Sequence, residues 1–483
     1  MAKDFIVAIE LGSSKITGMA GKKNPDGSIT ILAAASEDST SYIRKGVVYS
    51  IDKTTQGLSN IISKLKNSLQ ADITQVYVGI GGQSIHSVKN MVIKDLPMDA
   101  IVSQNMVNEL MDSNRNMTYP DYEIQDAITE EYKVDLQYQN DPVGIQASRL
   151  EGNFLNILWR RSFYRNLNKS FDNAGIAIAE TYLAPLVMAD NVLTEAEKRA
   201  GCVLVDLGAE TTTVSVYYRD KLRSIAVIPL GGDNITKDLE SLQMEACEAE
   251  RMKLKYSSAI TDVADIDPTA ILPIDSNRSV ESRHFIEVVE ARTLEIIENV
   301  KSFIPSEYID KLLGGIIITG GGSNMTNIEK AFREITGVEK IRIAKFVTLN
   351  INSKDSKPEL RHDGTMNTIL SLIARGDMNC AGNPFGNSLF DNQQFNAAFT
   401  TGTTNGTTTT QPNATTPHET EEERTKREEK ERIAKEEAER IKQEEETRKA
   451  KEEEERKKNS PIHRFFGSLK QFGRSLVEPE NNE

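Results

Sequence analysis

Two segments far apart in the chain carry an acid, a glycine and small hydroxyl residues at the same spacing. Residues 6–17 read Ile-Val-Ala-Ile-Glu-Leu-Gly-Ser-Ser-Lys-Ile-Thr, and residues 202–214 read Cys-Val-Leu-Val-Asp-Leu-Gly-Ala-Glu-Thr-Thr-Thr-Val. In each segment an apolar run ends at a carboxylate, a glycine permits a tight turn, and Ser or Thr precede a second apolar run. Both segments therefore predict a β-hairpin whose turn can approach a ligand closely.

The chemistry that suits such a pair of hairpins is phosphate and metal binding. Backbone N–H groups and hydroxyls at a small turn can approach phosphate oxygens, and the two acids, Glu10 and Asp206, can hold a hydrated Mg²⁺ between the hairpins. A single segment of this kind is more often an ordinary turn. The matched pair favours a phosphate site.

A third segment, residues 315–329, has a short apolar run, three consecutive glycines and then the pattern Thr326-x-x-Glu329. This pattern predicts a capping box at the start of a helix. Glycines before a helix N-terminus permit close approach of a nucleotide to the backbone. A purely structural strand-to-helix turn would explain the same residues.

The elements that must position these motifs alternate between strand and helix. Strand-like runs at 5–9, 203–205 and 316–319 alternate with helical patterns at 248–258 and 365–375. This alternation predicts an α/β fold for the first 380 or so residues, which have an ordinary globular composition.

Composition excludes several classes of function. The net charge of -14 argues against nonspecific nucleic-acid binding, which needs an excess of Lys and Arg. Three scattered cysteines and five histidines without metal spacing predict neither a disulfide framework nor a zinc site. The N-terminus lacks the unbroken apolar centre of a signal peptide, and no apolar run is long enough to span a bilayer. We expect an acidic cytoplasmic protein whose membrane contact, if any, is peripheral.

The chain changes character from about residue 390. A Thr- and Asn-rich stretch is typical of a flexible linker, and residues 419–458 are almost entirely Glu, Lys and Arg with acids four residues before bases. This charged stretch predicts a solvated single helix, a spacer on the order of 60 Å long if wholly helical.

An amphipathic segment follows the spacer. After Ser460, a good N-cap, and Pro461, apolar residues recur at three- and four-residue spacing beside basic ones. The segment predicts a helix that lies on an anionic membrane surface, although docking on the globular part or on a partner would use the same stripe. The residues that we expect to contact the membrane are Ile462, Arg464, Phe465, Phe466, Leu469, Lys470, Phe472, Arg474 and Leu476.

The two hairpins and the triple-glycine turn, in this order, resemble the actin, heat-shock-70 and sugar-kinase superfamily. Within it the chain is most similar to the FtsA family of bacterial cell-division proteins. The similarity covers roughly residues 4–380, and it is sharpest at Ile9–Lys15, Val78–Gly82, Asp206–Gly208, Gly231–Thr236 and Gly320–Ser323.

The resemblance implies a site for ATP and Mg²⁺. Glu10 and Asp206 would face the metal, whereas Glu250 and Lys253 match a helix that touches ribose and adenine in relatives, unless they are simply a salt pair on a surface helix. The remaining nucleotide-binding residues that it implies are Gly12, Ser13, Ser14, Lys15, Gly208, Glu210, Thr211, Thr212, Gly231, Gly232, Gly320, Gly321, Gly322 and Ser323. Many superfamily members carry Asp where this chain has Glu10, and no general base is evident, so we expect at most slow ATP hydrolysis.

The resemblance also implies an actin-like two-lobed fold with an inserted small domain. The expected parts are 1–82 with 166–202 as the first lobe, 83–165 as the inserted domain, 203–385 as the second lobe, 386–418 as the linker, 419–459 as the charged helical or disordered spacer and 460–478 as the amphipathic membrane-targeting helix.

The function that the resemblance implies is that of an adaptor in cell division. Such a protein would polymerise, anchor the ring of the tubulin-like protein FtsZ to the cytoplasmic face of the membrane at the division site, and recruit other division proteins. The inserted domain would be a contact surface for neighbouring subunits and division partners. Two alternatives stay open. One is a small-molecule kinase that uses the same cleft, and the other is an actin-like platform for pilus assembly or cell shape.

Overall fold

The computed structural model describes residues 4–262, 267, 269–353 and 358–381. These residues all belong to the first of two units of the chain, Met1–Phe390. The second unit, Asp391–Glu483, lies outside the described residues, and with it the predicted spacer and membrane helix.

A six-stranded sheet forms the first lobe, with the strand order β11-β6-β1-β2-β3-β19. Glycines let helices approach both of its faces closely: a Cβ at Gly18 would strike Ile61 of one helix, and a Cβ at Gly79 would strike Leu372 of another. The strands are β1 (Ile6–Leu11), β2 (Lys15–Lys23), β3 (Ile29–Asp38), β6 (Gln75–Ile80), β11 (Ala177–Leu183) and β19 (Ile351–Ser353), and the helices are α1 (Ile51–Leu69) and α11 (Asn367–Arg375).

A nine-stranded sheet has the order β18-β17-β12-β13-β14-β7-β10-β8-β9, and its first five strands form the second lobe. Helices α8 (Ser282–Ser302) and α10 (Ile328–Thr336) pack with these strands around a core that includes Val205, Ile297 and Phe332. The five strands are β12 (Cys202–Leu207), β13 (Thr212–Tyr218), β14 (Lys221–Ile228), β17 (Gly315–Thr319) and β18 (Ile341–Ile343).

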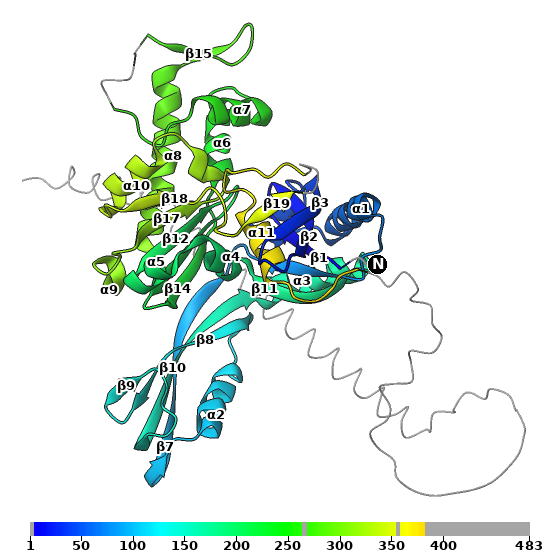
Figure 1. Cartoon of the computed structure of the whole chain (residues 1–483). Coiled ribbons are helices and arrows are strands. Elements are labelled where there is room, and N and C mark those ends of the chain that lie inside the picture. Colours follow the sequence, from blue (N-terminus) through cyan, green and yellow to red (C-terminus); the bar gives the residue numbers. More distant parts are fainter. Residues whose placement is uncertain (1–3, 263–266, 268, 354–357, 382–483) are drawn as a thin grey trace, which may run out of the picture. The chain divides into compact units, whose positions relative to one another are not determined.

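The other four strands of that sheet belong to the inserted domain, in which helix α2 (Gln104–Arg115) covers strands β7 (His86–Ile101), β8 (Tyr122–Val134) and β10 (Gln146–Arg160), with β9 (Gln137–Gln139) at the edge (Figure 1). The domain has a core of its own, which includes Leu110, Leu150 and Phe154. It joins the second lobe through the β7–β14 pairing at His86↔Ala226 and through an ion pair of Arg223 with Glu130. The two charged side chains are only 9% and 8% exposed and lie 3.3 Å apart, so this contact fixes the base of the domain against β14.

The remaining elements complete the two lobes. Helices α6 (Gly232–Glu240) and α7 (Ala246–Tyr256) pack with α8 around a separate core that includes Leu239, Met252 and Phe285. The others are β4 (Ile43–Arg44), β5 (Val47–Val48), α3 (Arg161–Asn173), α4 (Ala184–Val192), α5 (Glu195–Ala200), β15 (Ile271–Pro273), β16 (Ser279–Glu281), α9 (Ser306–Ile309) and the 3-10 turn η2 (Gly321–Asn324).

The predicted alternation of strands and helices is confirmed. The strand-like runs at 203–205 and 316–319 fall in β12 and β17, and the run at 5–9 overlaps β1, which begins one residue later. The two helical patterns match α7 and α11 with ends shifted by up to two residues. The fold is therefore a mixed α/β fold.

The predicted capping box at Thr326 is wrong. Helix α10 begins after Asn327, which has a left-handed φ of 59°, and no side chain caps it. The residues before the helix are engaged elsewhere, because the Ala259 N–H donates to the Thr326 carbonyl (2.8 Å) and the side-chain Nδ2 of Asn327 donates to Ser258 Oγ (3.0 Å). These tertiary hydrogen bonds, which no local pattern encodes, set the start of the helix.

Candidate functional site

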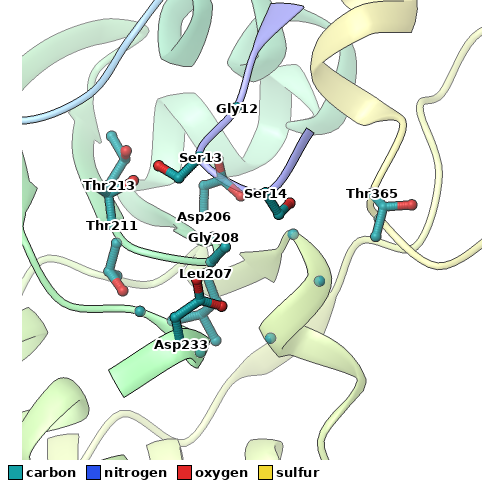
Figure 2. A pocket seen from close by; sticks show the side chains of 18 of the residues that line it. Gly12, Ser13, Ser14, Asp206, Leu207, Gly208, Thr211, Thr213, Asp233 and Thr365 are labelled. Atoms are coloured by element: carbon teal, nitrogen blue, oxygen red, sulfur yellow. The ribbon is translucent and has the colours of Figure 1, made fainter. Parts of the chain in front are cut away.

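A cavity of about 450 Å³ lies between the two lobes, and both predicted hairpins line it. Figure 2 shows Gly12, Ser13 and Ser14 of the first hairpin opposite Asp206, Gly208 and Thr211 of the second. The triple-glycine turn and helices α6 and α7 complete the wall. The structure thus brings together three motifs that are distant in the sequence.

The two hairpin turns have the same geometry. Gly12 N–H donates to the Lys15 carbonyl (3.0 Å), and Gly208 N–H donates to the Thr211 carbonyl (2.9 Å). A Cβ on either glycine would lie 2.8 Å from the carbonyl oxygen that its own N–H contacts, so each turn requires glycine. The acids also match in register, because Glu10 pairs with Thr17 and Asp206 pairs with Thr213.

Glu10 and Asp206 both line the cavity, in a partly desolvated environment, and their carboxylates are close enough to interact electrostatically. Burial, and then the nearby Asp206 carboxylate, raise the pKa of Glu10 to about 7, although Lys15 and a hydrogen bond with Thr368 oppose the shift. Burial raises the pKa of Asp206 to about 6. Two adjacent carboxylates that ionise reluctantly on their own are suited to a cation, which would favour the charged form of both.

This geometry predicts how the stability of the ligand-free protein depends on pH. The pKa of Glu10 is about 7 in the folded protein and 4.5 in the unfolded chain, so the folded protein holds this proton more tightly. The contribution of Glu10 to the free energy of unfolding therefore falls as pH rises from about 4.5 through about 7. Replacement of Glu10 with Gln removes the charge. After solvent screening we expect Glu10→Gln to stabilise the ligand-free protein by on the order of 1–2 kcal/mol at pH 8 and to have little effect at pH 5.

Thermal unfolding in EDTA at the two pH values measures this difference. The exposed Glu195→Gln variant is a suitable control, because its carboxylate is largely in solvent. An equal effect of Glu10→Gln at both pH values would contradict the shifted pKa.

The triple-glycine turn packs directly on the second hairpin. Gly320 has a φ of +83°, and a Cβ there would lie 2.6 Å from the Leu207 carbonyl oxygen and closer still to the Asp206 carboxylate. Ser323 is fully buried and donates to the Gly320 carbonyl (2.7 Å), which holds the turn in place. The glycines therefore leave the space beside Asp206 that a ligand or metal needs.

Glu250 and Lys253 lie on α7 at the far side of the cavity. Lys253 is only 8% exposed, and its Nζ donates to the Gly232 carbonyl (3.0 Å), to Thr236 Oγ1 (2.8 Å) and to Glu250 (2.6 Å). Thr236 Oγ1 also contacts the Glu250 carboxylate at 2.5 Å. The two residues are salt-paired, as the alternative interpretation required, but the pair lines the cavity and ties α7 to the start of α6.

Most of the predicted site residues line the cavity. Glu210 and Ser323 are the two exceptions: the Glu210 carboxylate accepts from the Lys45 N–H, and Ser323 supports the glycine turn from within the core. The predicted residues that line it are Glu10, Gly12, Ser13, Ser14, Lys15, Asp206, Gly208, Thr211, Thr212, Gly231, Gly232, Glu250, Lys253, Gly320, Gly321 and Gly322.

The sequence prediction missed several lining residues. Asp233 follows the two glycines that begin α6, and burial raises its pKa. That signal was present in the sequence as an acid next to a predicted glycine pair. Gly46, Gly364, Thr365 and Thr368 also line the cavity, but they come from loops and from α11, and no local pattern marks them.

The predicted membrane residues, from Ile462 to Leu476, lie outside the described residues. Among the helices that the structure describes, none is long and apolar enough to span a bilayer.

Comparison with known proteins identifies the relatives of this chain. A family model described as "Cell division protein FtsA" matches residues 203–361, and one described as "SHS2 domain inserted in FTSA" matches residues 82–158. The chain is 32% identical over 352 residues to the cell division protein FtsA of Porphyromonas gingivalis, with 71% of this chain and 74% of that protein covered. It is 29% identical over 369 residues to FtsA of Neisseria meningitidis, with 71% and 88% covered.

A solved structure supports the fold. The chain aligns with a protein of the PilM-PilN type IV pilus biogenesis complex with a TM-score of 0.53 and 14% identity, over 77% of this chain and 98% of that one. At this identity the likeness shows the fold alone. The predicted actin-like fold with an FtsA-type inserted domain is confirmed.

Proposed function

This chain belongs to the FtsA family of cell division proteins, and from that premise we propose that it is an ATP-binding adaptor that anchors the FtsZ ring to the membrane. In this proposal the nucleotide closes the two lobes, closed subunits associate into filaments, and the C-terminal segment holds the filament on the cytoplasmic face of the membrane at the division site. Anionic lipid, FtsZ and other division proteins are the partners.

The observation that carries the nucleotide part of the proposal is the pair of equivalent hairpin turns that face one cavity. Each turn has a glycine that no other residue can replace without a clash, so the backbone can approach phosphate oxygens from both lobes. Lys15 lines the same cavity and supplies a positive charge for the phosphates. The nucleotide-binding character of the fold family agrees with this arrangement.

The residues present fit a magnesium ion. Mg²⁺ in proteins is held by one or two carboxylates, several waters and substrate phosphates, and Glu10 and Asp206 are the acids on the strands that lead into the two turns, β1 and β12. The bound ion would supply positive charge beside the phosphates. The chain's own part is to orient those two carboxylates through β1 and β12, and Gly320 keeps the space beside Asp206 open.

The proposal includes at most slow hydrolysis of ATP. The role of an anchor needs a nucleotide-dependent shape and no rapid turnover. Membership of the FtsA family supports the cell-division role over a small-molecule kinase or a pilus platform, since the pilus protein shares the fold alone.

Titration of the full chain with a fluorescent ATP analogue tests the nucleotide part. We expect saturable binding that unlabelled ATP reverses and that weakens by about tenfold or more in EDTA, because the phosphates and the two acids would then repel each other. A kinase would instead show rapid ATP consumption that one metabolite stimulates. Absence of binding at millimolar analogue would refute the nucleotide part of the proposal.

A further inference from the structure

A two-residue turn between β4 and β5 contacts both phosphate loops, which are the turns of the hairpins at Gly12 and Gly208. The Gly46 N–H donates to Ser13 Oγ (2.8 Å) in the first hairpin, and the Lys45 N–H donates to the Glu210 carboxylate (2.5 Å) in the second. Lys45 belongs to the first lobe and Glu210 to the second, so the latter hydrogen bond crosses between the lobes. The Glu210 side chain is only 19% exposed, and it also pairs with Lys237 at 3.6 Å.

The same turn packs against the start of the inserted domain. The Gln83 N–H donates to the Lys45 carbonyl (2.8 Å), and both Gly46 and Gly82 have positive φ, of +73° and +96°. A Cβ on Gly46 would lie 2.5 Å from Gly82 Cα, and a Cβ on Gly82 would lie 2.5 Å from the Gly46 carbonyl oxygen. The two backbones are therefore in direct contact, and a shift of the turn has to displace Gly82.

Gln83 leads straight into the inserted domain. Its carbonyl accepts from Trp159 Nε1 of β10 at 3.3 Å, and two residues later the Ile85 carbonyl accepts from the Val227 N–H of β14 (3.1 Å). The base of the domain is thus held between the turn on one side and the second lobe on the other.

We infer that the Lys45–Gly46 turn transmits the state of the nucleotide site to the inserted domain, and that Glu210 is the positioning residue that ties this turn to the second phosphate loop. The inference rests on the proposed nucleotide site and assigns it a route of communication. Glu210 acts through the Lys45 backbone, since it is not among the residues that line the cavity.

The hydrogen bonds explain why the turn should respond to phosphate. A hydroxyl has one donor and two acceptor positions, and Gly46 N–H occupies an acceptor position of Ser13 Oγ, which leaves the hydroxyl hydrogen available to a phosphate oxygen. A phosphate that draws Ser13 toward it pulls on Gly46. Glu210 keeps the other end of the turn on the second phosphate loop, so closure of the lobes also moves Lys45.

Trp159 provides a direct readout, because it is the only tryptophan of the chain and contacts the Gln83 carbonyl. The experiment compares the change in Trp159 fluorescence on addition of Mg²⁺ and ATP with binding of a fluorescent analogue, in the full chain. For Glu210→Ala we expect an affinity within about tenfold of the wild type, as for loss of one hydrogen bond, and a fluorescence response reduced by at least about half.

Two further substitutions distinguish the effect of side-chain length at position 210 from the effect of its charge. Glu210→Gln keeps an acceptor oxygen at the same reach and should retain most of the response, whereas Glu210→Asp keeps the charge, falls short of Lys45 and should lose it. Lys237→Ala removes the ion pair of Glu210 and leaves its hydrogen bond with the Lys45 N–H, so it serves as the matched control with a full response. If Glu210→Ala does not fold, the contrast between Glu210→Gln and Glu210→Asp decides the question.

The outcomes distinguish this inference from the proposed function. A wild-type protein that binds nucleotide without a Trp159 response, or Glu210→Asp and Glu210→Ala variants with full responses, would overturn the inference and leave nucleotide binding intact. A wild-type protein that binds no nucleotide would remove both.

Discussion

Replacement of Asp206 with Asn should weaken binding of ATP in the presence of Mg²⁺ by more than about 100-fold, because it removes one of the two carboxylates that we assign to the metal. The side chain keeps its shape and place at the end of β12, so backbone contacts with the nucleotide should persist. The loss should therefore be concentrated in the Mg²⁺-dependent part of the affinity. Titration of a fluorescent ATP analogue, with Mg²⁺ and with EDTA, measures it.

A second readout separates this effect from misfolding. Burial raises the pKa of Asp206 to about 6, so its charge at pH 8 costs free energy in the ligand-free protein. Asp206→Asn should consequently unfold at an equal or higher temperature than the wild type in EDTA, although it binds nucleotide far more weakly. Loss of both stability and binding would indicate a damaged fold instead of a lost metal contact.

Asp233→Asn is the matched control. Asp233 lines the same cavity, and burial raises its pKa as well, but it lies at the start of α6, where its N–H donates to the Ala209 carbonyl (2.7 Å). Its loss should reduce affinity by less than about tenfold and leave the Mg²⁺ dependence in place. An equal loss for the two variants would contradict the assignment of Asp206 to the metal.

The paired hairpins could be predicted because their signal is local. A run of β-forming residues, one acid, one glycine and hydroxyls within about a dozen positions dictate a turn with little help from the rest of the protein. The equivalence of Glu10 with Asp206 was visible in the sequence, and the structure repeats it in strand register. Convergence of the two hairpins on one cavity followed from the resemblance and could not be derived from spacing.

The parts that the sequence did not predict depend on distant contacts. Thr365 enters the cavity from the loop before α11, and Gly46 enters it because its backbone packs on Gly82. Glu210 was assigned to the nucleotide, but the structure turns its carboxylate to Lys45 on the opposite lobe. For Gly46 and Glu210 the decisive partner lies more than thirty residues away, where periodicity and turn patterns carry no information.

Removal of the segment after Ser460, which lies beyond the described residues, should strongly weaken membrane binding. At 100° per residue, a helix over residues 460–478 would place Phe465, Leu469 and Phe472 on one side. Burial of each such side chain in the membrane interface contributes up to about 1.5–3 kcal/mol, and each basic residue near anionic lipid adds about 1 kcal/mol. We therefore expect a chain that ends at Ser460 to lose more than about 100-fold in affinity for anionic vesicles.

Point substitutions make the prediction specific to the apolar side of that helix. Phe465→Glu with Leu469→Glu should reduce vesicle binding nearly as much as the truncation, whereas Gln471→Glu with Ser475→Glu adds the same two charges away from the apolar stripe and should reduce it far less. Sedimentation with vesicles of anionic and of neutral lipid, with ATP present, measures all four proteins. Because the added negative charge is matched, a difference between the two double variants reports apolar burial and not electrostatic repulsion. Equal pelleting of the intact and truncated chains would contradict the assignment of membrane binding to this segment.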